Sequence, residues 1–184
     1  FSKISLKKEM EPFDSFLIFI ADFLGDHLYE GIFFAALIET VIPPIPTLAI
    51  FPTAGFLASQ QGISLFGVIP MIILGATGAT IGTSVIYLIA LKLGRTVLLK
   101  YLKNFRISEK KLERVEIWFE KYGDKAVLIG RMVPVMREMI SVPAGLLKMK
   151  IPKFILFTFI GSCIWSSITI LAGYYFGEAM GLTV

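Results

Sequence analysis

Two long stretches without a charged side chain constrain this sequence more than any other feature. Residues 40–91 contain no Asp, Glu, Lys, Arg or His over 52 positions, and residues 154–177 contain none over 24 positions. A helix needs about 20 predominantly apolar residues to cross the hydrocarbon core of a bilayer. Two segments reach that length without interruption, and we predict transmembrane helices at Leu65–Leu91 and Phe154–Phe176.

The composition agrees with a membrane protein. Apolar residues make up 55% of the chain and the mean hydropathy is +0.76, which is above the range of soluble domains. With 184 residues the chain has the length of about one domain. We therefore predict a single all-α membrane domain over residues 1–184, multi-pass, in the cell membrane. The single cysteine, Cys163, excludes an internal disulfide.

Basic residues are concentrated in the second half of the chain. Ten Lys or Arg lie between Lys92 and Lys125, and Lys148, Lys150 and Lys153 follow soon after. Cytoplasmic loops of membrane proteins carry an excess of Lys and Arg, so both basic segments are expected on the cytoplasmic side.

Prolines interrupt two shorter apolar stretches. The run Ile32–Ile42 ends at Pro43-Pro44-Ile45-Pro46, whose rings cannot continue a helix. Eleven residues are too few to cross about 30 Å of hydrocarbon, so we predict a re-entrant hairpin that returns through 47–59. In the second half, residues 125–135 enter the membrane, Pro134 and Pro143 break the helix, and residues 148–152 mark the return to the surface.

The two halves also share a residue spacing. The matched positions are Gly78, Ile81, Ser84, Leu88 and Gly94 in the first span and Gly161, Ile164, Ser167, Leu171 and Gly177 in the second. True duplication and shared membrane composition both explain five matches. Under duplication, each unit is a hairpin plus one span and crosses an odd number of times, so the repeats are inverted. The expected limits are about 30–94 and 125–178, with a basic connector at about 95–124.

Amphipathic helices are expected at two places outside the spans. Residues 13–29 place their acidic side chains within one arc of a helical wheel, which is typical of an interfacial helix. Within the connector we predict a helix over Ser108–Tyr122, with Ser108 as the N-cap. Two placements of this second helix stay open: on anionic lipid, or packed on the bundle with a solvated polar face.

Charged residues inside the apolar segments are the candidate functional residues. Arg131 and Arg137 flank Pro134 in an otherwise apolar stretch, and Glu39 lies in the first hairpin. An arginine stays protonated, and a charge near the bilayer centre costs at least about 2.5 kcal/mol, so such residues normally face a partner, a wet cavity or a ligand. Two hairpins inserted from opposite faces would bring these three side chains together near the midplane.

The motifs resemble those of one family. Glu39-x-x-x-Pro43-x-x-Pro46, the glycine-rich first span, Gly130-Arg131-x-x-Pro134-x-x-Arg137 with Ala144-Gly145 downstream, and Trp165 in the last span resemble the DedA family, also called the SNARE-associated or VTT-domain group. The resemblance covers about residues 30–178. Many members carry a second acid after the first hairpin's prolines, where this chain has Pro46-Thr47-Leu48.

The resemblance implies a transporter of lipid phosphates, a flippase or scramblase for polyprenyl phosphates or phospholipids, for which proton coupling has been proposed. In that family the acid of the first hairpin and the two arginines of the second are functional, which points to Glu39, Arg131 and Arg137. Relatives usually have a further helix after the span with the Trp, and this chain starts at Phe1 rather than Met. The expectation is therefore that segments at either end have been cut.

The residues themselves favour an anionic headgroup as the ligand. Two guanidinium groups can hold a phosphate through bidentate, charge-assisted bonds, and half-helix N-termini add a positive dipole end. The substrate-binding candidates are Arg131, Arg137 and Glu39. Possible cavity or hairpin-break residues are Pro43, Pro46, Pro134, Glu138 and Gly145. The alternative for the three charges is an ionic clasp that fixes the two hairpins together.

Other functional classes were weighed against transport of a lipid phosphate. The single histidine, His27, is remote from the arginines in sequence and no metal-ligand cluster is visible, which argues against a lipid phosphatase. The chain is therefore predicted not to be an enzyme, with no cofactor, no metal and no nucleic acid as partner. A proton- or ion-coupled exporter of small solutes and a membrane scaffold stay open as alternatives. Membrane lipids are the expected partners, and the small-residue faces of the spans would permit a homodimer.

Overall fold

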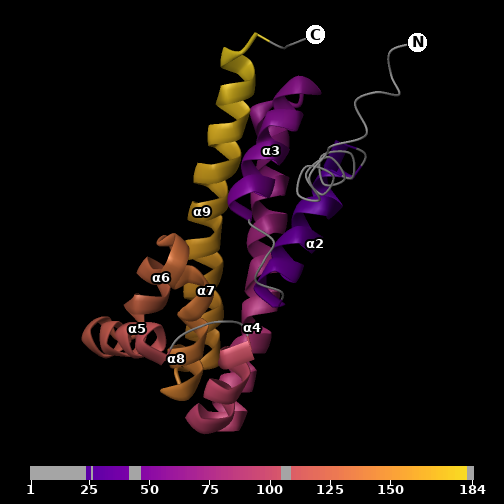
Figure 1. Cartoon of the computed structure of the whole chain (residues 1–184). Helices are drawn as coiled ribbons and strands as arrows, with labels where there is room; N and C mark the ends of the chain where they lie inside the picture. Colours follow the sequence, from indigo (N-terminus) through magenta and orange to yellow (C-terminus); the bar gives the residue numbers. More distant parts are fainter. Residues whose placement is uncertain (1–23, 26, 42–46, 105–108, 182–184) are drawn as a thin grey trace.

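The computed structural model describes residues 24–25, 27–41, 47–104 and 109–181, and this part of the chain is all-α (Figure 1). The helices are α2 (Leu28–Val41), α3 (Thr47–Gln60), α4 (Leu65–Asn104), α5 (Glu109–Tyr122), α6 (Lys125–Arg131), α7 (Pro134–Met139), α8 (Ser141–Leu146) and α9 (Ile151–Ala179). The predicted class, all-α, is confirmed for these residues.

Two long helices form the axis of the structure. Residues Leu65–Gly94 of α4 and Ile151–Ala179 of α9 are 30 and 29 residues long and apolar enough to cross a membrane. They pack against each other and run in opposite directions (Figure 1). Both predicted apolar helices are confirmed, and each is a few residues longer than the sequence indicated, because flanking residues such as Lys92 and Lys153 are also part of the helices.

The shorter helices are distributed over both long ones. α2 packs on α4 and α3 packs on α9, beside the upper part of the pair in Figure 1. α6 packs on α9 and α8 packs on α4, beside the lower part. Each group of short helices therefore contacts both long helices, and the two groups approach from opposite ends of the bundle.

Glycines allow the backbones to touch at these crossings. A Cβ on Gly55 of α3 would collide with the carbonyl oxygen of Ile170 in α9, and one on Gly173 would collide with the backbone of Pro52. Where α8 crosses α4, a Cβ on Gly145 of α8 would lie 2.5 Å from the carbonyl oxygen of Tyr87 in α4. Small residues at such contacts are typical of helix packing in membranes.

Gly94 ends the straight part of α4. Its φ of 68° and ψ of 177° are not helical, and this positive φ favours glycine over any residue with a side chain. The backbone continues as a helix to Asn104 beyond this kink. The kink lies at residue 94; the division of the chain into repeats and a connector stays a prediction.

The apolar core falls into two groups of buried side chains. One joins α2, α3 and the first half of α4 to the C-terminal half of α9, and includes Ile32, Phe51 and Ile170. The other joins the rest of α4 to α5, α6, α8 and the start of α9, and includes Val127 and Phe154. Buried polar residues, among them Glu39, Arg131 and Arg137, belong to neither group.

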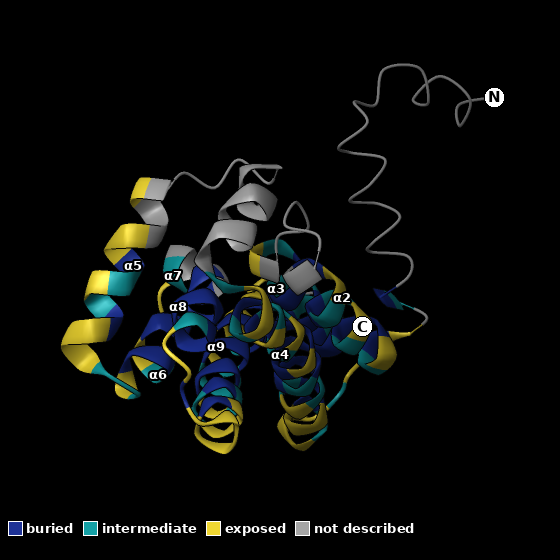
Figure 2. Cartoon of the chain, turned by 90° about the horizontal axis from the view of Figure 1, so that it is seen from below, coloured by how far each residue is buried: buried dark blue, intermediate teal, exposed yellow. Residues whose placement is uncertain are grey.

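Large apolar side chains also cover the outside of both long helices (Figure 2). The exposed ones at helical spacing are Phe66, Ile69, Ile73, Ile81, Val85 and Leu88 on α4, and Ile151, Ile155, Ile160, Ile168 and Tyr175 on α9. Exposed apolar faces of this extent are unfavourable in water and favourable in hydrocarbon.

Of the two helix breaks predicted at Pro134 and Pro143, the second is wrong. Pro134 begins α7, as a residue that breaks the preceding helix should. Pro143 does not mark a break: it lies inside α8, and the helix is interrupted one turn earlier, at Ile140. The reason is that a proline ring clashes with the carbonyl four residues before it, here that of Met139, the last residue of α7.

The connector helix α5 packs on the bundle through its apolar stripe. Val115 and Phe119 are buried in the second core group, whereas Ile117 is 61% exposed. This placement is one of the two expected for the helix; contact with anionic lipid stays a prediction. The predicted N-cap, Ser108, lies outside the described residues, as do Pro43, Pro46 and most of the predicted helix 13–29.

The α3–α9 crossing supplies a first test of the fold. Gly173→Ala places a methyl group against the backbone of Pro52, which cannot move independently of α3. We expect a loss of about 1–3 kcal/mol of stability, as is usual for overpacking. Thermal unfolding in detergent measures it. Gly25→Ala is the matched control, since nothing lies within 4 Å of its added Cβ. Equal unfolding temperatures for both variants would contradict the described crossing.

Candidate functional site

The spacing Arg-x-x-Pro-x-x-Arg produces a helix–turn–helix. α6 ends at Arg131, and Val133 is extended, with φ −104° and ψ 120°, because a residue before proline avoids the helical region. Pro134 then occupies the first position of α7, and Arg137 lies in its last turn. The proline therefore places the two arginines on separate short helices that point in different directions.

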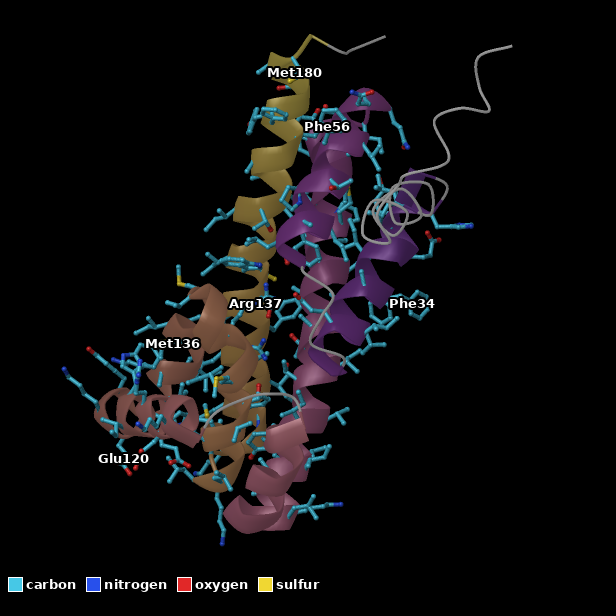
Figure 3. All side chains as sticks on the ribbon, viewed as in Figure 1. Phe34, Phe56, Glu120, Met136, Arg137 and Met180 are labelled. Atoms are coloured by element: carbon cyan, nitrogen blue, oxygen red, sulfur yellow. The ribbon has the colours of Figure 1, made fainter. Side chains whose placement is uncertain are left out.

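Arg137 contacts a carboxylate and an aromatic ring. Its Nη2 lies 3.6 Å from Oε2 of Glu39 in the last turn of α2, and both side chains are 9% exposed. The centre of the guanidinium group lies 5.0 Å from the ring centroid of Trp165 in α9, within the range of a cation–π interaction. Figure 3 shows Arg137 at mid-height of the bundle, between Phe56 toward one end and Glu120 toward the other.

Arg131 is the more deeply buried of the two arginines, with 2% of its surface exposed. Its Nη2 lies 3.4 Å from the Oγ of Ser141 in α8, a long hydrogen bond. The stem of the side chain rests on α9 at Gly161, where an added Cβ would lie 2.6 Å from the Cβ of Arg131. Gly161 is thus required for Arg131 to reach the interior.

One turn of α9 brings the two arginines together. Arg131 rests on Gly161 and Arg137 lies over Trp165, four positions later in the same helix. Four residues correspond to about 6 Å along the helix axis. The site therefore combines two cations and one carboxylate from three helices, α2, α6 and α7, beside one turn of a fourth helix, α9.

Three buried polar atoms near this turn have no hydrogen-bond partner within the part of the chain that is described. They are Nε of Arg131, Oγ1 of Thr158 and Nε1 of Trp165. Unpaired buried donors are few in folded proteins, and each costs about 1–3 kcal/mol. Thr158 and Trp165 lie on the face of α9 that carries Gly161. This clustering gives the site spare donors for an acceptor.

The predicted site residues have different outcomes. Glu39, Arg131 and Arg137 are all buried, and Glu39 contacts Arg137. Gly145, in α8, packs against the backbone of Tyr87 in α4, and its place at a cavity or hairpin break stays a prediction. Pro134 is at the start of α7, but its side chain and that of Glu138 lie outside what is described. A role in substrate binding stays a prediction for all of these residues.

Sequence reasoning missed the contribution of α9. In the sequence, Trp165 stands out only as part of the family motif, and Ser141 and Thr158 carry no signal of their own. Gly161 and Trp165 share a helix face by their spacing of four, which was a usable signal. The ring contact with Arg137 was not predictable, because it depends on how α7 is directed after Pro134. Over the described ranges, no three His, Cys, Asp or Glu side chains form a group that could hold a metal ion.

Comparison with known families identifies the chain. The model of the VTT domain matches residues 45–175, which include both arginines and Trp165. The chain belongs to the VTT-domain family. The resemblance to the DedA group drawn from the Arg131–Arg137 motif is thereby confirmed. Glu39 precedes the matched residues, so the VTT-domain match does not itself cover the carboxylate of the site.

Several curated VTT-domain relatives are similar over most of their length. A protein of Lactococcus lactis named alkaline phosphatase-like protein is 33% identical over 155 residues, covering 82% of this chain and 71% of the relative. The undecaprenyl phosphate transporter A of Staphylococcus aureus is 30% identical over 167 residues, with coverages of 89% and 81%. The protein of the same name from Bacillus subtilis is 34% identical over 150 residues, with coverages of 82% and 72%. No solved structure matches this VTT-domain chain.

A double-mutant cycle tests the buried pair. Glu39→Gln and Arg137→Gln should each lower stability by about 3 kcal/mol, because either change leaves a buried charge less compensated. The double variant should be more stable than the sum of the two losses predicts, by about 1–3 kcal/mol. Unfolding by denaturant in detergent micelles gives the four values.

The control cycle uses the ion pair between Lys153 and Asp124. Its atoms are closer, at 2.7 Å, but the side chains are 55% and 38% exposed, so solvent should reduce the coupling to below about 1 kcal/mol. A coupling at Glu39–Arg137 no larger than this one would show that burial adds nothing to the contact.

Proposed function

We propose that this protein moves a lipid with an anionic phosphate headgroup, such as a polyprenyl phosphate, between the leaflets of a membrane. The observation that carries the proposal is the convergence of two buried arginines on one turn of α9, between helices apolar enough for a bilayer. The names of the Staphylococcus and Bacillus relatives add support, since both state undecaprenyl phosphate transport.

The choice of arginine supports a phosphate ligand. A guanidinium fork matches two phosphate oxygens at once, and it remains charged at every physiological pH. Placing such a group at membrane depth costs several kcal/mol, which an apolar packing residue would avoid. Two forks in one place therefore favour binding of an anion over a purely packing role.

Glu39 acts as an internal substitute for the anion in this proposal. Its carboxylate lies 3.6 Å from Arg137, longer than a well-formed charge-assisted bond of about 2.7–2.9 Å. A phosphate with more oxygens and a higher charge can displace so loose a partner. Protonation of Glu39 would have the same effect on Arg137, which gives a route by which protons could be coupled to transport.

An inverted repeat is supported by equivalent contacts at the crossings. Gly78 and Gly161 are 83 positions apart and contact α2 and α6, the first helix of each group. Tyr87 and Ile170 are also 83 positions apart, and their carbonyls face Gly145 and Gly55, in the second helix of each group. Shared composition alone does not generate matching contacts.

Two tyrosines also make equivalent contacts between the two halves of the chain. The hydroxyl of Tyr87 in α4 donates to the carbonyl of Met149, in the loop between α8 and α9. The hydroxyl of Tyr174 in α9 donates to the carbonyl of Ile63, in the loop between α3 and α4, at 2.8 Å. In each case a long helix holds the loop of the other half. We propose that the two hairpins are re-entrant and inserted from opposite leaflets, with the arginines near the midplane.

The basic end of the bundle is proposed to face the cytoplasm. Lys92, Lys148, Lys150 and Lys153 are exposed near the end where α9 begins, while the turn at 61–64 at the other end is uncharged. This distribution agrees with the positive-inside rule.

Cysteine labelling tests this orientation. In a Cys163→Ala background, Lys150→Cys should react with a membrane-impermeant maleimide only from the cytoplasmic side, and Ser64→Cys only from the outer side. Both positions are exposed, so lack of reaction would reflect sidedness rather than burial. Labelling of both positions from one side would contradict opposite insertion of the two hairpins.

Transport is tested with purified protein in liposomes that contain a fluorescent polyprenyl phosphate. Arg131→Lys and Arg137→Lys should each slow movement between leaflets by about tenfold or more, since a lost charge-assisted bond contributes about 1.5–3 kcal/mol. Arg114→Lys on α5 is the matched control, because this arginine is exposed and outside the site. Full transport by both site variants would disprove the role of the arginines in phosphate binding.

The same liposomes separate the alternative functions. Release of inorganic phosphate would indicate hydrolysis, the activity that the name of the Lactococcus relative suggests for that protein. If neither movement nor release is observed, an exporter of small solutes and a membrane scaffold remain as the possible functions. A homodimer stays a prediction, to be measured by the mass of the detergent-solubilised protein.

A further inference from the structure

Trp165 has a donor that no residue in the described part of the chain accepts from. Its side chain is 9% exposed, and its Nε1 is buried without a hydrogen-bond partner among the described residues. The N–H of a buried tryptophan usually has a partner. An indole cannot bond back to the carbonyl of its own helix as a threonine can, so the partner of this N–H must come from elsewhere.

Neighbouring polar side chains on the long helices show the contrast. Thr80, Thr83 and Thr169 each donate to a carbonyl one turn earlier, and the hydroxyls of Tyr87 and Tyr174 each donate to a loop carbonyl. Burial in this bundle is thus generally accompanied by a hydrogen bond. Trp165 departs from that pattern at the one position where the indole also contacts a buried arginine.

The indole of Trp165 lies near both arginines, at one turn of α9. Arg137 lies over its ring, and Arg131 rests on Gly161 one turn away, with its own Nε also unpaired among the described residues. An anion held by the two guanidinium groups would lie beside this turn of α9. The N–H of Trp165 is then a neutral donor close to it, as is the hydroxyl of Thr158 on the same face of α9.

The number of terminal oxygens distinguishes the headgroups that could bind. A phosphate diester has two terminal oxygens and one negative charge, and two guanidinium groups can satisfy both. A phosphate monoester has three terminal oxygens and a charge of about −1.5 to −2 at neutral pH. Two arginines balance that charge once Glu39 has been displaced, and the third oxygen can accept from a further donor.

We propose that Trp165 is a headgroup ligand whose indole N–H binds the terminal oxygen that a phosphate monoester has and a diester lacks. This inference rests on the proposed function and assigns to α9 the choice between classes of lipid phosphate. The ring has a second effect, because its face stabilises the charged Arg137 at the moment when Glu39 leaves it.

The experiment compares two substrates with the same tail. Fluorescent polyprenyl phosphate and its phosphate methyl ester differ in one terminal oxygen, and their rates of movement are measured in liposomes for wild type and Trp165→Phe. We expect the wild type to prefer the monoester, and the variant to reduce that preference about tenfold, mainly through a higher KM for the monoester. Trp118→Phe on α5 is the control and should keep the wild-type preference.

A second variant removes the N–H without changing the ring shape. Site-specific incorporation of benzothienylalanine at position 165 replaces the indole N–H by sulfur, and thermal unfolding in detergent checks that this protein is folded. It should lose the preference as Trp165→Phe does. An unchanged preference in the folded benzothienyl protein would overturn the role of Trp165 while leaving transport intact. Movement of neither substrate by wild type would instead reject the proposed function itself.

Discussion

Burial of two guanidinium groups among apolar helices is the constraint on which the rest of this structure depends. Each group must be compensated, and the compensation comes from different elements: the carboxylate of Glu39 on α2, the hydroxyl of Ser141 on α8 and the ring of Trp165 on α9. Because these partners belong to separate helices, the two cations determine where the ends of the short helices lie.

Close packing of the helices keeps the two guanidinium groups buried. Each group of short helices places one helix on each long helix, so neither half can form its core without the other. Glycines at the crossings bring backbones into contact, which excludes water and lipid from the space between them. A protein built in this way has a rigid frame of α4 and α9 and shorter elements whose ends meet at the charged residues.

The sequence predicted most of the frame and part of the site, for identifiable reasons. Long charge-free runs located α4 and α9, since length and hydropathy depend only on local composition. The charges in apolar segments identified Glu39, Arg131 and Arg137, because their cost requires a partner. The break near Pro143 was placed one turn late, and the contact of Trp165 with Arg137 was missed. The first follows from a local rule, since a proline ring clashes with the carbonyl four residues before it. The second depends on the direction of α7 after Pro134, which residue spacing does not encode.

A transport site must release what it binds, and the geometry around Arg137 fits that requirement. A tight, bidentate bond to Glu39 would exclude an incoming anion, whereas the absence of any partner would leave a cation in an apolar interior. The contact with the carboxylate and the contact with the indole face are among the interactions that hold Arg137 in the apolar interior. In the proposed mechanism an anion replaces Glu39 while the ring stays in place, so Arg137 keeps the ring contact in both the empty and the occupied state. Release of the lipid then needs only the return of the carboxylate to Arg137.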